Sequence, residues 1–71
     1  MDIEKCVNFI DNNIGRKVIM EIKRMGAKEN ETIIGTINEP FSNEDSPSCK
    51  IKTEKLLDEI FLGEILSAEF A

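Results

Sequence analysis

A helical pattern that stops at a glycine and turns at once into an alternating strand restricts the fold of this chain more than any other feature. Gly15 is the stop, and apolar side chains then occupy every second position, at Val18, Met20 and Ile22. Such period-two alternation predicts a strand with one buried face. A polar turn follows, and then a second strand that carries Gly35. This order predicts a mainly β fold with an N-terminal helix, arranged as a small barrel.

The whole chain, residues 1–71, is expected to form a single domain, because its length suits one small core. Apolar residues recur at helical spacing over residues 2–13, and Asp2 is suited to cap this helix. The apolar face of the helix, which we expect to pack on the barrel, comprises Ile3, Cys6, Val7, Ile10 and Ile14. Strands are expected over residues of about 16–25, 31–38, 48–53 and 64–70.

Residues 54–62 fit two structures. Leu57, Ile60 and Phe61 have helical spacing, with Thr53 as a plausible N-cap and Gly63 as a plausible stop. The same segment also fits a strand that bends at the glycine, because short apolar runs cannot be assigned by periodicity alone. The sequence therefore leaves open a short helix at 54–62, which would argue against a barrel.

Residues 39–48 form an acidic loop by composition, with two prolines, three serines and three acidic side chains. The aromatic side chain in this loop either tucks under it as an anchor or is exposed to a partner, and we favour the anchor. The candidate protein-contact residues of the loop are Glu39, Phe41, Glu44 and Asp45.

The net charge of −5 argues against general nucleic-acid binding, because phosphate contacts need a cationic surface. Basic residues nevertheless dominate residues 16–28 and 49–55. If the first and third strands lie near each other, these residues form a local basic patch; the commoner role of such lysines is to solvate exposed strand faces. The candidate RNA or anion patch comprises Arg16, Lys17, Lys23, Arg24, Lys50 and Lys52.

The chain lacks the residues that most catalytic and metal sites need. It contains no histidine, which removes the usual general base near neutral pH and the commonest metal ligand. Two cysteines without a Cys-x-x-Cys pair do not suit structural zinc. No glycine-rich phosphate loop is present. We therefore expect no enzymatic activity, no metal and no cofactor.

We expect a cytoplasmic protein with reduced thiols. The N-terminal residues form no apolar segment of the kind that signal peptides carry, and the longest apolar run spans only residues 60–62, far below the roughly 20 residues of a membrane span. Cys6 lies on the apolar face of the helix, and Cys49 alternates in phase with Ile51. Both cysteines are expected to be small core residues.

Residues 14–23, the glycine in residues 34–37 and the Gly63 segment at residues 61–66 resemble the Sm-like proteins. That family combines a short helix with a five-stranded, SH3-like barrel, which the resemblance implies for this chain. The family's RNA pocket is not carried over, because Phe41 and Asp45 occupy the places of its Asp and Asn, and Leu62 replaces its basic residue. Small acidic relatives in the family bind proteins.

Our leading hypothesis is therefore a non-enzymatic, acidic, cytoplasmic binding module that contacts a protein partner, without a membrane. The negative charge, the acidic loop and the missing catalytic residues support it. The alternative is an Sm-like RNA-binding protein that uses the basic patch on the first and third strands and assembles as a homo-oligomer.

Overall fold

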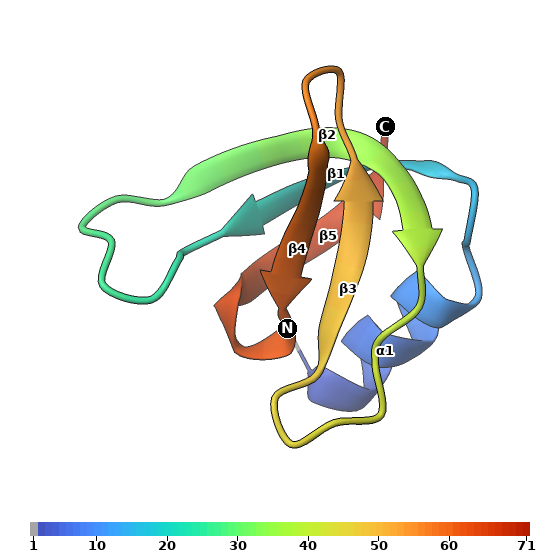
Figure 1. Ribbon diagram of the computed structural model, residues 1–71, viewed down its shortest axis with the longest axis horizontal. Helices are drawn as coiled ribbons and strands as arrows, with labels where there is room; N and C mark the ends of the chain where they lie inside the picture. The colour runs from blue at the N-terminus through green and yellow to red at the C-terminus, as the bar shows by residue number, and fades with distance from the viewer. Residues whose placement is uncertain (1) are drawn as a thin grey trace.

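The computed structural model describes residues 2–71 as one α-helix and one five-stranded antiparallel sheet (Figure 1). The elements are α1 (Ile3–Asp11), β1 (Lys17–Ile22), β2 (Glu31–Glu39), β3 (Ser48–Lys52), β4 (Leu57–Phe61), the short 3-10 helix η1 (Leu62–Glu64) and β5 (Ile65–Phe70). The strands lie in the order β4-β3-β2-β1-β5. The prediction of a mainly β fold with an N-terminal helix is confirmed.

Helix α1 is shorter than the predicted range of 2–13. The side chain of Asp2 caps its start, where Oδ1 accepts hydrogen bonds from the N–H groups of Glu4 (2.8 Å) and Lys5 (3.3 Å). The side-chain amides of Asn12 and Asn13 bond carbonyls of the last turn and end the helix. Within residues 2–71, no helix has the length and apolar character needed to cross a membrane.

Only part of the predicted helical face is buried. Cys6 and Ile10 are almost fully covered, but Ile3 and Ile14 remain 68% and 44% exposed. The expectation that all five apolar residues pack on the sheet is therefore wrong for these two. Ile14 lies beyond the end of the helix, and Ile3 lies in its first turn.

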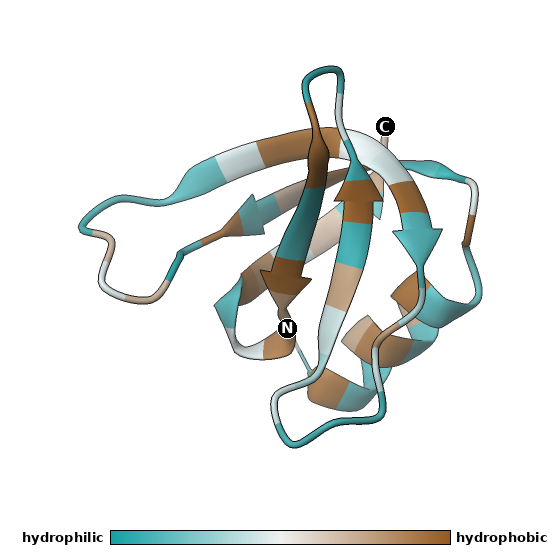
Figure 2. Cartoon of the chain, in the orientation of Figure 1, coloured by the Kyte–Doolittle hydropathy of each residue, from teal (hydrophilic) through white to brown (hydrophobic). Residues whose placement is uncertain are grey.

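The core lies between the two halves of the curved sheet. Side chains of β1, β2 and β4 alternate between a buried and a more exposed face, and those of β3 do so from Cys49 onward; Figure 2 shows the apolar and polar segments of these strands. The buried cluster comprises Ile10, Val18, Met20, Ile22, Ile33, Ile37, Cys49, Ile51 and Ile60. Because strands on both sides of β2 contribute to one cluster, packing across the curved sheet adds to the pairing that β2 makes with β1 and β3.

Gly35 allows β3 to approach β2 closely. A Cβ atom at this position would lie 2.6 Å from the carbonyl oxygen of Lys52 and 2.7 Å from a methyl carbon of Ile51. The strand β2 is long and strongly curved (Figure 1), and it pairs with β1 on one side and β3 on the other. A glycine inside a strand commonly marks such a close backbone approach, because a side chain there would not fit.

Residues 54–61 contain no helix and only Leu62 begins the short η1, so the alternative of a short helix over 54–62 is wrong. Residues 57–61 form β4, which pairs with β3 in a hairpin. The hydroxyl of Thr53 accepts hydrogen bonds from the N–H groups of Lys55 (3.3 Å) and Leu56 (3.2 Å). The threonine that looked like a helix cap therefore closes a hairpin turn, because a threonine hydroxyl can accept backbone N–H groups at a helix start and in a turn alike.

The sheet does not close into a barrel, in contrast to the closed form that the resemblance implied. Strand β4 pairs with β3 and strand β5 with β1, so these two strands are the edges. The three-residue η1 turns the chain away from β4 and brings β5 to β1. Arg24, just after β1, instead forms ion pairs with Glu31 on β2 (3.1 Å) and with Asp58 on β4 (2.6 Å).

Both cysteines are buried and free, as expected for core residues. Burial is the largest of the causes, with smaller contributions from the negative charges of Cys6 and Asp11, that together raise the pKa of the Cys49 thiol to about 12. Burial likewise raises the pKa of Cys6. Both thiols are therefore protonated and unreactive near neutral pH.

The close approach at Gly35 predicts that Gly35→Ala lowers the free energy of unfolding by about 1–3 kcal/mol, because the methyl group meets backbone atoms of β3 that cannot yield easily. The matched control is Gly63→Ala, since nothing lies within 4 Å of a Cβ there. Urea denaturation followed by circular dichroism measures both. Equal stabilities of the two variants would show that β3 can move away.

The raised pKa of Cys49 predicts a loss of stability at alkaline pH. The protonated thiol favours the folded state fully below the unfolded pKa of about 9, and this contribution is lost as the pH rises towards about 12. Between about pH 8 and pH 10, the wild type should lose about 1–2 kcal/mol more than Cys49→Ala does. Urea denaturation at both pH values measures this difference, and parallel losses would exclude the buried thiol as its cause.

Candidate functional site

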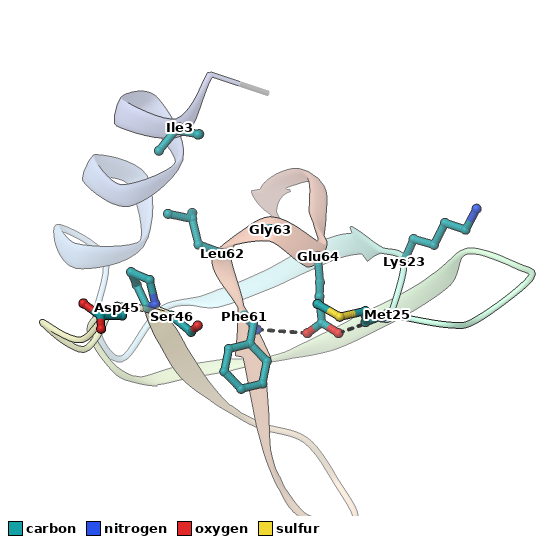
Figure 3. A pocket seen from close by; sticks show the side chains of 10 residues that line it. Ile3, Lys23, Met25, Asp45, Ser46, Phe61, Leu62, Gly63 and Glu64 are labelled. Atoms are coloured by element: carbon teal, nitrogen blue, oxygen red, sulfur yellow. Dashed lines mark hydrogen bonds between the residues drawn. The ribbon is translucent and has the colours of Figure 1, made fainter.

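A groove of about 540 Å³ opens where four segments meet: the first turn of α1, the end of β1, the loop before β3 and the β4–η1 turn. Figure 3 shows its lining side chains. The apolar part of the lining comprises Ile3, Met25, Pro47, Phe61 and Leu62, and the charged part comprises Lys23, Asp45 and Glu64. It is a mainly apolar hollow with a few charged groups, which is the usual character of a binding site.

The buried carboxylate of Glu64 holds two walls of this groove together. Its Oε1 accepts a hydrogen bond from the N–H of Phe61 (3.0 Å), and its Oε2 accepts one from the N–H of Met25 (3.2 Å), as drawn in Figure 3. Its own carbonyl accepts the N–H of Lys23 (2.8 Å). The side chain is only 9% exposed. These bonds join the end of β1 to the β4–η1 turn and set the spacing of the walls.

The groove gathers apolar side chains that the core does not use. Met25 is 92% exposed, Ile3 is 68% exposed and Phe61 is 40% exposed. They come from the turn after β1, from α1 and from β4 respectively. Single exposed apolar residues are ordinary on a protein surface, but a concave group of them is typical of an interaction site.

The loop of residues 40–47 forms the remaining wall and is held at several points. The N–H of Phe41 bonds to Asp11 (3.0 Å), and its ring packs against the core, as expected for an anchor. The carbonyl of Pro47 accepts the N–H of Leu62 (2.9 Å). These contacts fix the loop while Asp45 stays exposed beside the groove.

The four candidate contact residues of the loop lie at two places. Asp45 borders the groove. Glu39, Phe41 and Glu44 line a second, more polar hollow of about 330 Å³. Glu39 is also paired with Lys50 at 3.7 Å. Only the Asp45 end of the predicted loop therefore belongs to the apolar groove.

The candidate basic patch does not form one surface. Arg24 is bound to Glu31 and Asp58, which raise its pKa, in that order of size. Lys50 pairs with Glu39, and the guanidinium of Arg16 lies 4.1 Å from the centroid of the Phe70 ring. Half of the candidate patch is thus engaged within the protein.

The remaining three candidates, Lys17, Lys23 and Lys52, have no ion pair within residues 2–71. Register places Lys17 and Lys52 on either side of Thr36, with β2 between their strands. The two lysines are therefore about 10 Å apart at their backbones. Lys23 lies elsewhere, on the groove.

Met25, Ile3, Phe61 and Leu62 were not among the candidate site residues of the sequence. One signal was present: Met25 falls out of phase with the buried residues of β1 and precedes Gly26 in a charged turn. Ile3 matches the helical period, and Phe61 and Leu62 belong to an apolar run, so all three looked like core residues. Which apolar residues remain uncovered depends on how the segments meet.

Comparisons of the chain with models of protein families, with curated proteins and with solved structures found no match. Within residues 2–71, no group of three or more metal-binding side chains is suitably arranged to hold an ion.

The bonds to Glu64 predict that Glu64→Gln lowers the free energy of unfolding by about 1–3 kcal/mol, because an amide offers one acceptor oxygen where two N–H groups need partners. Glu69→Gln, on an exposed position of β5, is the control and should change stability little. Thermal denaturation of both variants measures this. Equal melting temperatures would show that Glu64 does not hold the groove walls.

Proposed function

We propose that this protein is a non-enzymatic binding module that receives apolar side chains of a protein partner in the groove. The exposed Met25, 92% accessible beside Ile3 and Phe61 in a concave site, is the observation that carries this proposal. Burying one such side chain against a partner contributes about 1.5–3 kcal/mol. The groove offers several of them together.

Charge favours a basic partner. Asp45 borders the groove, and Glu44 precedes Asp45 in the loop. The whole chain carries a net charge of −5. An acidic surface increases the rate of encounter with a basic protein, an effect that salt weakens. Lys23 adds one positive charge on the groove, which restricts how a partner can orient.

We further propose that the open sheet is an incompletely closed form of the Sm-like, SH3-like barrel. The order of one helix and five antiparallel strands supports this relation, as does a close-packed glycine in the second strand. The proposal concerns the architecture and does not extend to the family's RNA pocket, whose residues this chain lacks.

RNA binding is the second candidate function, supported by Lys17 and Lys52. These two side chains flank Thr36 without an ion pair within residues 2–71. Arg16, Arg24 and Lys50 would have to leave their present partners to join them. Protein binding is favoured because its site needs no such rearrangement.

The protein-binding proposal predicts that Met25→Thr weakens capture of the partner at least about tenfold, since it removes an exposed apolar side chain of the groove. Ile34→Thr is the matched control, because Ile34 is 51% exposed on β2, outside the groove lining. The tagged protein and both variants would be used to capture partners from an extract of the source cells, with binding then quantified. Equal capture by the two variants would contradict the proposal.

A parallel titration separates the two candidates. Labelled protein is mixed with short U-rich and A-rich RNA, and the amide signals of residues 16–24 and 50–52 are followed by NMR. We expect no change. Salt-dependent shifts at these residues, together with an oligomeric mass, would favour RNA binding instead.

A further inference from the structure

Strand β4 has an unpaired edge that ends at the groove. Within residues 2–71 it pairs only with β3, and it contains no lysine or proline; of its two charged residues, Asp58 is ion-paired with Arg24 (2.6 Å). The N–H of Phe61 bonds to the Glu64 side chain instead of to β3. Because backbone direction alternates along an antiparallel strand, the N–H and C=O groups of Leu57 and Glu59 also point away from β3.

The side chains beside this edge alternate in character. Leu57 is 50% exposed and Phe61 is 40% exposed, with the exposed Glu59 between them on the same face. Oε2 of Glu59 accepts a hydrogen bond from the Ser48 hydroxyl (2.9 Å), and Glu59 has no ion pair within residues 2–71. The edge therefore presents an apolar, an acidic and an apolar position in turn.

We propose that an extended segment of the partner protein adds to β4 as an antiparallel sixth strand, with a basic residue opposite Glu59 flanked by two apolar residues. This inference rests on the proposed function and specifies the partner's chemistry. Main-chain hydrogen bonds to Leu57 and Glu59 supply affinity, and the cross-strand charge pair supplies specificity. The apolar residue opposite Phe61 extends into the groove, because Phe61 belongs to both surfaces.

The chain's own edge strand is a poor occupant of this site. Residues 56–71 contain no lysine or arginine, so β5 of a second copy cannot place a cation opposite Glu59. Its only charged residue, Glu69, adds repulsion. Moreover, Glu64 already bonds the N–H of Phe61, which limits the added ladder to a short segment.

The probe is a short synthetic peptide in which every second residue is a threonine. The residues between the threonines are valine, lysine and valine, and they form the face that meets Leu57, Glu59 and Phe61. Added to labelled protein at up to about 1 mM, it should shift the amide signals of Leu57 and Glu59. It should also slow their hydrogen exchange at least about tenfold, because they gain acceptors. N-methylation of the valine and lysine nitrogens should abolish binding, because their N–H groups point toward β4. N-methylation of the threonine nitrogens, whose N–H groups point away from β4, should not.

A charge exchange tests the pairing. Glu59→Lys should prefer a peptide with glutamate in place of lysine, and the wild type should prefer the lysine peptide. Lys28→Glu, in the turn before β2, is the control and should leave the preference unchanged. An unchanged preference in Glu59→Lys would refute the pairing.

Three other outcomes would overturn strand addition. The first is peptide binding with unchanged exchange at Leu57 and Glu59, which would leave groove binding intact. The second is no binding up to about 1 mM. The third is an oligomer whose Leu57 and Glu59 amides are already protected without peptide, which would show that a second copy occupies the edge. Loss of discrimination between Met25→Thr and Ile34→Thr in partner capture would instead refute the proposed function.

Discussion

The carboxylate of Glu64 links the turn after β1 to the end of β4 and thereby sets the spacing of two walls of the groove. Its two oxygens bond the N–H groups of Met25 and Phe61, which lie at the ends of different strand pairs. Arg24 makes a second link, from the end of β1 to β2 and β4. A sheet without a ladder between its edges needs such side-chain links, since packing alone does not set the spacing of surface segments. Their geometry decides where Met25 and Phe61 stand.

The proposed binding surface combines two features that meet at Phe61. The groove offers apolar area, and the edge of β4 offers backbone groups in register. Apolar area supplies affinity without direction, whereas hydrogen bonds along an edge impose direction and register. In this proposal, the acidic residues Asp45 and Glu59 favour a basic partner. A small module can recognise a short segment in this way without catalytic groups.

Individual residues show why prediction succeeded in some places and failed in others. The cap at Asp2 and the close approach at Gly35 were predictable, because each follows from local backbone chemistry. The hydroxyl of Thr53 was ambiguous, since helix starts and hairpin turns use it alike. The basic patch was overestimated because Arg24 and Lys50 find acidic partners from distant or neighbouring strands, and such pairings depend on register.

The amino-acid sequence by itself determined the mainly β class, the N-terminal helix, the acidic loop and the burial of both cysteines, because alternation, capping and composition act over a few residues. Only the tertiary structure decided that Ile3 and Met25 stay uncovered, that Glu64 becomes the link between segments, and that β4 is left as an edge. The physical reason is that exposure and edge position depend on how segments distant in the chain pack against one another, which local periodicity does not encode.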